Sequence, residues 1–322
     1  MTQSSGFQIY IVGFIVLAVI CLSGPQICRA QKNGESGRKY LESAIKSLNV
    51  LSVTGFKLTK DGQLHISQPD SQKAIAALAK MNGTEILPLV TLKSSSEGRA
   101  LLASPKSRKR AVAELTALVG GDYAWVHLDF EYLPPDDVHL LAVFLWEFRS
   151  ALGGKKLTMA VFPPVDFPEK WSGFHDLKLI GPLVDEVVVM CYDYHRPGTP
   201  PGPVTDLKWM ERNIKQVLKN LRPEQVWLGV PAYGYDWPKG GKAKVVSARD
   251  GVKLAAQHNA VRDASGTLHF QYAQHEHGET HEVYLSDLET RKRMEDMARS
   301  YGLKGVALWR LGFEEGSTST SE

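Results

Sequence analysis

From about residue 36 onwards, segments with the hydrophobic pattern of an α-helix alternate with segments that have the pattern of a β-strand. This alternation of strand, helix and strand predicts parallel strands that are covered by helices on the outside. We expect strands at 48–58, 84–91, 126–133, 156–162, 185–192, 225–233 and 305–311, and helices at 39–47, 72–81, 105–119, 138–152, 174–179, 207–221 and 288–301.

These strands are one short of the eight that close a (β/α)8 TIM barrel, which is the α/β fold that the alternation predicts. The chain has 322 residues, of which 43% are hydrophobic and 23% are charged, so it can fill one large domain with a single core. We expect that barrel domain to span 31–316. The position of its first strand is uncertain from the sequence.

The charges of the chain are interspersed, and the formal net charge is only +3. One basic run, 106–110, opens a stretch in which Ala111, Leu115 and Leu118 recur at helical spacing. This pattern is typical of a solvated helix face and not of a patch that binds nucleic acid. We therefore expect no nucleic acid partner.

The segment 237–286, between the last two expected strands, has an organisation of its own. Residues 247–258 have a helical pattern, and 268–273 and 281–285 alternate like two strands of a hairpin. We expect a small α+β insertion between strands 7 and 8 that forms one wall of a cleft. The tail 317–322 is polar and is expected to be disordered.

Three histidines of this insertion, His275, His277 and His281, raise the question of a metal site. No cysteine or acidic ligand stands at a fixed spacing from them, so exposed histidines are favoured over a zinc site. We expect neither a metal nor another cofactor.

The amino-terminal segment has the pattern of an export signal. Residues 9–22 are almost uninterruptedly apolar, and Cys28-Arg29-Ala30 offers small residues for cleavage, which predicts a signal peptide at 1–30 and a secreted, periplasmic or cell-envelope protein. Because 1–8 carry no positive charge, an uncleaved membrane anchor is an alternative. A further alternative is that 8–14 form the first barrel strand. After cleavage only Cys191 would remain, so no intramolecular disulfide is expected, and the oligomeric state is not indicated.

The octet 126–133, Val-His-Leu-Asp-Phe-Glu-Tyr-Leu, predicts a site at the end of a strand. Alternating side chains would place His127, Asp129 and Glu131 on one face and apolar residues on the other. Two buried carboxylates this close are costly unless they have partners or do chemistry, and barrels of this kind keep their active sites at the carboxyl ends of the strands. A strand tip whose acids lie in solvent remains the alternative.

Three further strand ends, at 190–195, 229–237 and 305–312, concentrate aromatic and polar side chains. Flat apolar rings with polar edges suit the binding of pyranose sugars when they share a rim with paired carboxylates. Each aromatic taken alone could equally be a core residue, but the coincidence of four strand ends favours a sugar site.

These motifs resemble the barrels of glycoside hydrolase family 18. The family's Asp-x-x-Asp-x-Asp-x-Glu signature falls on Ala124, His127, Asp129 and Glu131. Its Met-x-Tyr-Asp signature matches Met190, Tyr192 and Asp193, and its floor tryptophan matches Trp309. The likeness is closest to the catalytic domain of bacterial spore-cortex-lytic N-acetylglucosaminidases, through 229–237 with Tyr233 and Tyr235, the insertion, and 281–284.

The resemblance implies a glycosidase that acts on β-linked N-acetylglucosamine polymers of peptidoglycan or chitin type. Such enzymes retain the anomeric configuration, because the 2-acetamido oxygen of the substrate is the nucleophile. Glu131 would be the general acid and base, Asp129 would hold the acetamido N–H, and Tyr192 would donate to the acetamido oxygen. Asp193, Met190, Trp309, Tyr233, Tyr235 and His127 are the expected substrate-binding residues.

Two residues of the strand-four motif depart from the family pattern: His127 stands where the family has Asp, or often Asn in the spore-lytic branch, and Ala124 replaces the first Asp. A protonated imidazole could bond to Asp129 and favour its ionised form. The bulky Trp125 stands where the family has glycine, for which the sequence offers no reason. The competing class is a non-catalytic, lectin-like protein on the same fold, but such members usually lose the acid that Glu131 retains. A purely structural role has no positive support in the sequence.

Overall fold

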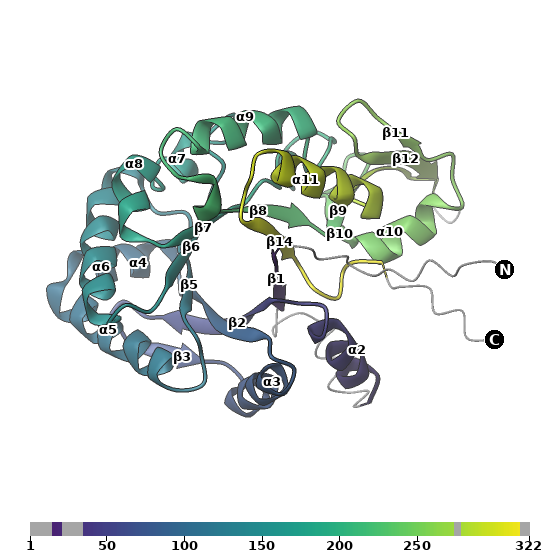
Figure 1. Ribbon diagram of the computed structural model, residues 1–322. Coiled ribbons are helices and arrows are strands. Elements are labelled where there is room, and N and C mark those ends of the chain that lie inside the picture. Colours follow the sequence, from purple (N-terminus) through teal and green to yellow (C-terminus); the bar gives the residue numbers. More distant parts are fainter. Residues whose placement is uncertain (1–14, 21–34, 274–277, 316–322) are drawn as a thin grey trace.

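The structure is a computed structural model that describes residues 15–20, 35–273 and 278–315, the first six and 35–39 by their backbone only. It contains a closed barrel with a smaller lobe at one side (Figure 1). The eight parallel strands of the barrel are β1 (Ile15–Ile20), β2 (Val50–Leu58), β4 (Glu85–Leu92), β5 (Val126–Asp129), β6 (Leu157–Val161), β7 (Glu186–Val189), β8 (Val226–Pro231) and β14 (Gly305–Trp309).

The barrel closes because β1 pairs with β14 on one side and with β2 on the other. Its residue Ile15 is in register with Gly305 of β14, and Leu17 is in register with Val50 of β2. The short β3 (Leu64–Ile66) adds an antiparallel hairpin to β2 at the edge of the barrel. The expected (β/α)8 barrel is confirmed. The strand that completes the seven expected ones is β1, and it lies within the segment that the sequence predicts to be an export signal.

Cleavage near Ala30 therefore stays a prediction, and it would remove β1 from the mature chain. The alternative first strand at 8–14 lies outside the described residues. None of the helices in the described part of the chain is long and apolar enough to cross a membrane.

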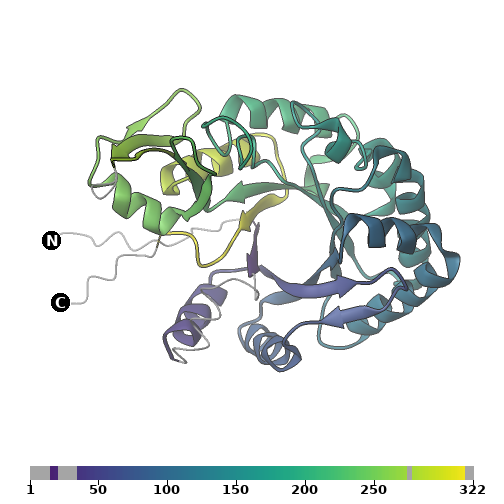
Figure 2. The same cartoon turned by 180° about the vertical axis from the view of Figure 1, so that it is seen from behind.

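Helices cover the outside of the barrel, as both views show (Figure 1, Figure 2). Their ends follow local signals: Ser104 accepts a hydrogen bond from the Ser107 N–H at the start of α5, Pro105 is its first residue, and Gly121 follows its end. The outer helices are α2 (Glu35–Ile45), α3 (Pro69–Met81), α4 (Ser95–Ala103), α5 (Pro105–Gly120), α6 (Val138–Ala151), α7 (Glu169–Ser172), α8 (Leu177–Ile180), α9 (Leu207–Val217) and α11 (Leu288–Ser300).

The basic run at the start of α5 is not wholly solvated, contrary to expectation. Arg108 is buried against α6, where its Nε and Nη2 atoms donate to the two carboxylate oxygens of Glu147 at 2.9 and 3.0 Å. Its Nη1 donates to the carbonyl oxygen of Leu102 at 2.7 Å. Arg108 therefore joins α4, α5 and α6, and it does not contribute to a basic surface.

Trp125, which the sequence left unexplained, fills the interior of the barrel. It belongs to a buried cluster with Val50, Leu87, Val188, Trp227 and Ala307, which come from five different strands. The Lys156 ammonium lies 4.2 Å from the centre of its ring. The large indole therefore fills interior volume that smaller side chains would otherwise have to fill.

The lobe is larger than the predicted hairpin. Its sheet has five strands in the order β10-β9-β13-β12-β11, with α10 (Ala248–Ala255) packed beside them. Three of its strands are not expected from the sequence: β9 (Tyr233–Pro238), β10 (Lys244–Ser247) and β11 (Val261–Arg262). The other two, β12 (Leu268–Ala273) and β13 (Thr280–Leu285), agree with expectation. Tyr233 and Tyr235 thus belong to the lobe sheet and not to the barrel strand before it.

His281 of β13 is buried, and its Nδ1 lies 2.8 Å from the Asp236 carboxylate, so it is not the exposed histidine that we expected. His275 and His277 lie outside the described residues.

Candidate active site

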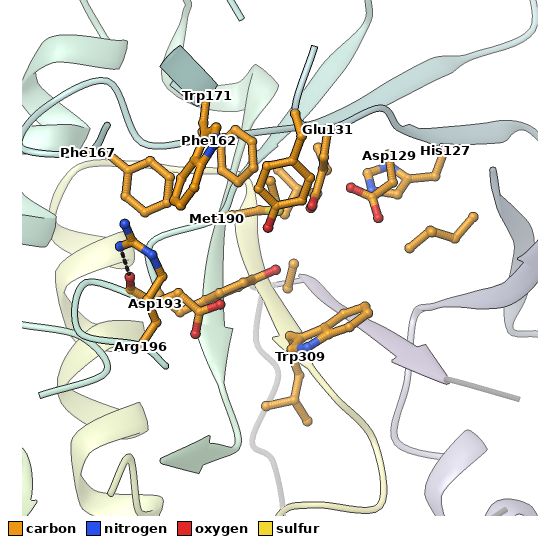
Figure 3. Close-up of a pocket in the computed structure, with 17 residues that line it drawn as sticks. His127, Asp129, Glu131, Phe162, Phe167, Trp171, Met190, Asp193, Arg196 and Trp309 are labelled. Atoms are coloured by element: carbon orange, nitrogen blue, oxygen red, sulfur yellow. Dashed lines mark hydrogen bonds between the residues drawn. The ribbon is translucent and has the colours of Figure 1, made fainter. Parts of the chain in front are cut away.

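A cavity of about 270 Å³ opens at the carboxyl ends of the barrel strands (Figure 3). Its walls come from β4, β5, β6, β7 and β14 and from the segments that follow β5, β6 and β7. The lining residues are Leu89, His127, Asp129, Glu131, Tyr132, Ala160, Phe162, Phe167, Trp171, Val188, Met190, Tyr192, Asp193, Arg196, Ala307, Leu308 and Trp309.

The three polar residues of the octet all line this cavity. The hydrogen-bonded strand β5 ends at Asp129, shorter than expected, so Glu131 lies just beyond it. The alternation nevertheless continues, because Leu128 and Phe130 are fully buried on the opposite side. The alternative in which the acids lie in solvent is excluded by the position of both carboxyl groups in the cavity wall.

Burial raises the pKa values of both acids, and the neighbouring charge of Asp129 raises that of Glu131 further. Burial, the charge of Asp129 and a hydrogen bond to that carboxylate raise the pKa of Glu131 well above its usual range. Burial also raises the pKa of Asp129, to about 6, although its hydrogen bond to Glu131 counteracts this. The pair therefore favours a proton on Glu131 and a charge on Asp129. The Oδ1 atom of Asp129 is buried without a hydrogen-bond partner among the described residues.

His127 lies in the same wall but does not form the expected bond to Asp129. Its Nδ1 lies 2.8 Å from the Thr158 hydroxyl, which is also within 3.2 Å of the Val126 carbonyl oxygen. Burial lowers the pKa of His127 to about 4, so the imidazole is neutral near pH 7. Stabilisation of the Asp129 carboxylate by an imidazolium, which the sequence suggested, therefore does not arise at this pH.

Tyr192 and Asp193 reach the cavity from the segment after β7. Burial and the three neighbouring carboxyl groups raise the pKa of the Tyr192 hydroxyl, which keeps it a hydrogen-bond donor. Asp193 has a left-handed backbone conformation with φ of 59°, which is uncommon for a residue other than glycine and is often found at functional sites. Burial raises its pKa, although two tyrosine hydroxyls counteract this.

Those two hydroxyls belong to Tyr233 and Tyr235 of the lobe. They donate to the same oxygen of Asp193, at 2.6 and 2.8 Å. Neither tyrosine is among the residues that line the cavity, and both bond to Asp193, which does line it. Their expected contact with a sugar stays a prediction. The lobe thus reaches the site through Asp193.

The cavity has aromatic walls on two sides. Trp309, at the end of β14, and Met190, directly after β7, line it as expected. The opposite wall, which is not expected from the sequence, is formed by Phe162, Phe167 and Trp171. Phe162 and Phe167 stack with their ring centres 5.1 Å apart, and Tyr132 packs edge-on against Trp171. Phe162 directly follows β6, Phe167 lies in the loop after it and Trp171 lies in the short α7. No recognisable motif covers them, and only their high aromatic content could have indicated them.

A buried histidine that the sequence analysis also missed fixes the backbone beside Glu131. The Phe162 N–H donates to His175 Nδ1 at 3.0 Å, and His175 Nε2 donates to the Phe130 carbonyl oxygen at 2.9 Å. Burial lowers the pKa of His175 to about 4, which keeps it neutral. It thereby ties the residue before Glu131 to the aromatic wall.

Chemically, this cavity combines one protonated carboxyl group, one carboxylate beside it, a tyrosine hydroxyl and flat aromatic surfaces. Such a set can protonate a leaving oxygen and stabilise a positive charge that develops nearby. In the described part of the chain, no group of three or more histidine, cysteine and acidic residues is arranged to hold a metal ion.

The chain is similar to known glycosylases and lytic enzymes. The chain is 27% identical over 304 residues to the putative sporulation-specific glycosylase YdhD of Bacillus subtilis, covering 88% of this chain and 71% of that protein. It is 25% identical over 301 residues to the cortical fragment-lytic enzyme of the same organism, covering 88% of this chain and 69% of that protein.

Among solved structures, the spore cortex-lytic enzyme SleL of Bacillus cereus has a similar fold. The TM-score is 0.84 at 23% identity, over 94% of this chain and 72% of that one. The model of glycosyl hydrolases family 18 matches residues 30–314, almost the whole of the barrel and lobe. The chain therefore belongs to glycosyl hydrolases family 18, and it is a glycoside hydrolase with the barrel of that family.

Proposed function

We propose that this protein hydrolyses β-linked glycans that contain N-acetylglucosamine, by a retaining and substrate-assisted mechanism with Glu131 as general acid and base. The observation that carries the proposal is the pairing of Glu131 and Asp129 in one cavity with Tyr192, Asp193 and Trp309. Only one protein acid is needed in such a mechanism, because the 2-acetamido oxygen of the sugar attacks the anomeric carbon.

Glu131 donates its proton to the leaving glycosidic oxygen in the first step. The raised pKa of this carboxyl group favours its protonated form, which a general acid requires. When the leaving group has departed, Glu131 is ionised and accepts a proton from the water that opens the oxazolinium intermediate. This second step restores the starting state.

Asp129 and Tyr192 hold the acetamido group in the attacking position. The Asp129 carboxylate accepts from the acetamido N–H and stabilises the positive charge of the oxazolinium ion, for which its unpartnered Oδ1 is available. The Tyr192 hydroxyl donates to the acetamido oxygen. Asp193, held by Tyr233 and Tyr235, positions this group, and Trp309 is the floor under the sugar ring.

We further propose that the protein acts outside the cytoplasm, as the apolar segment at 9–22 suggests. Relatives named as a cortical fragment-lytic enzyme and a sporulation-specific glycosylase support a cell-wall glycan as the substrate. A chitin-type glycan has the same N-acetylglucosamine unit and is the alternative substrate.

The test is to incubate the purified protein with cell-wall sacculi and with N-acetylglucosamine oligomers, and to weigh the products by mass spectrometry. Glu131→Gln should lower kcat by at least about a thousandfold, because the amide cannot donate a proton to the leaving oxygen. Glu224→Gln is the matched control. Glu224 is exposed and lies before β8, at the opposite end of the barrel.

Binding of an N-acetylglucosamine oligomer should persist in Glu131→Gln, as measured by calorimetry. Equal activity of Glu131→Gln and Glu224→Gln would remove Glu131 as the acid. Binding without hydrolysis by the unmodified protein would instead favour the lectin-like alternative.

A further inference from the structure

One side chain of the cavity, Arg196, has no role in the mechanism above. Its guanidinium group lies against the aromatic wall, with the central carbon 4.6 Å from the ring centre of Trp171 and 5.1 Å from that of Phe167. Its Nη1 donates to the Asp193 carbonyl oxygen at 3.0 Å. The aromatic rings therefore hold one face of the guanidinium group, and the Asp193 carbonyl oxygen holds its Nη1 end (Figure 3).

The loop that carries Arg196 is itself held in place. The Arg196 N–H donates to the Thr199 hydroxyl at 3.0 Å, and this hydroxyl lies 2.9 Å from the Arg196 carbonyl oxygen. Within the described part of the chain, no carboxylate forms an ion pair with Arg196, although the charge of Arg196 lowers the pKa of nearby Asp193. Its Nε and Nη2 donors thus remain for a ligand.

Arg196 is also the one cationic side chain among the described residues that line the cavity, because His127 is neutral. The acidic side chains there are Asp129, Glu131 and Asp193, and the carboxylate charges among them would repel a negatively charged substituent on the sugar. A substrate that carries a carboxylate needs a compensating cation on the same wall. A neutral glycan does not need one.

We propose that Arg196 binds a carboxylate carried by the substrate, so that the enzyme prefers a carboxylate-bearing N-acetylhexosamine glycan of the peptidoglycan type to neutral chitin. The planar guanidinium can bond both oxygens of a carboxylate while its face stays on Trp171. This inference rests on the proposed function and names the substrate class of the same site.

The chain offers a matched control for this arginine. Lys170 is exposed, and its ammonium lies 5.2 Å from the centre of the same Trp171 ring, but it is not among the residues that line the cavity. Lys170→Met therefore removes a cation from the same aromatic residue without removing one from the cavity.

The experiment compares kcat/KM on two oligomers of equal length. One is a neutral N-acetylglucosamine oligomer, and the other is a peptide-free glycan in which alternate sugars carry a 3-O-lactyl carboxylate. The readout is the ratio of the two kcat/KM values, because Arg196 also bonds to the Asp193 backbone and its loss can lower both. Arg196→Met should lower the preference for the charged oligomer at least tenfold, and Lys170→Met should leave the ratio within twofold.

Arg196→Lys keeps the charge but loses the planar fork, so it should retain part of the preference. Raising the salt concentration from 50 to 500 mM should lower the ratio for the unmodified protein, since an ion pair at a partly exposed site is screened. A third oligomer, with its carboxylates converted to methyl amides, should show no dependence on Arg196.

The same measurement on glycans that carry stem peptides distinguishes the two sources of a carboxylate. Dependence on Arg196 in the peptide-free glycan assigns the sugar carboxylate, and dependence only in the peptide-bearing glycan assigns a peptide carboxylate. A ratio that Arg196→Met changes no more than Lys170→Met, on both glycans, would overturn this inference while leaving the proposed function intact. Hydrolysis of none of these oligomers would instead contradict the proposed function.

Discussion

The proton on Glu131 is a consequence of its surroundings. An isolated glutamate is ionised at neutral pH, but burial and the neighbouring Asp129 raise the pKa of this one. The pattern of the octet was sufficient to predict that both acids share a face. It could not show how His127 is bonded, because the partner Thr158 lies on another strand, 31 residues away.

The pH dependence of activity should reflect Asp129. Burial raises the pKa of this carboxyl group to about 6, so protonation removes its charge as the pH falls below that value. We expect kcat/KM to decline below about pH 6, measured between pH 4 and 8 on an N-acetylglucosamine oligomer. A decline that begins only near pH 4 would contradict the assignment of Asp129.

His127 offers a second test of the same carboxylate. His127→Asn replaces one neutral side chain by another, so the midpoint of the acid limb should stay within about half a unit. His127→Asp adds a carboxylate beside Asp129 and should raise that midpoint by about one unit. If His127→Asn alone moves the midpoint by a full unit, the imidazole is charged in the active enzyme, contrary to our account.

At the scale of elements, hydrophobic periodicity located the seven barrel strands after β1, but tertiary contacts set where they end. The segment 229–237 was interpreted as one strand end, whereas β8 ends at Pro231 and β9 begins at Tyr233. The residues after Pro231 pair with β13 of the lobe instead, and Gly234 lies in this pairing. A Cβ at position 234 would lie 1.9 Å from the Tyr284 carbonyl oxygen of β13. Such a close approach of a distant strand is not visible in a local pattern.

The ion pair between α5 and α6 should contribute strongly to stability. Arg108→Met leaves the partly buried Glu147 carboxylate without its partner, so we expect the free energy of unfolding to fall by about 3 kcal/mol. Arg110→Met removes an exposed ion pair with Glu114 on the same helix, so it should change the free energy of unfolding by less than about 0.5 kcal/mol. Urea unfolding measures both. Equal effects would mean that Arg108 is no more important than a surface charge.

At the scale of the whole molecule, the closure of the barrel depends on β1. The sequence could not place this strand, because a short apolar run fits an export signal and a buried parallel strand equally well. Only the pairing with β14 and β2 locates the strand at 15–20.

Removal of residues 1–30 tests this closure. A protein that begins at residue 31 leaves β2 and β14 unpaired along the edges that face β1, so its Tm should lie at least about 5 °C below that of the full chain. Scanning calorimetry of both proteins in the same detergent-containing buffer gives the comparison. Equal Tm values would show that 15–20 contribute nothing to the closed barrel, as expected for a removable signal.

The central claim is that one protein acid and the acetamido group of the substrate share the chemistry of a single cavity. The anomeric configuration of the first-formed product tests it most directly, by proton NMR recorded within the first minutes of hydrolysis of a β-linked N-acetylglucosamine oligomer. Our account predicts the β-anomer, since two successive inversions retain the configuration. Initial formation of the α-anomer would contradict it, because a single inversion needs a second protein carboxylate that activates water directly.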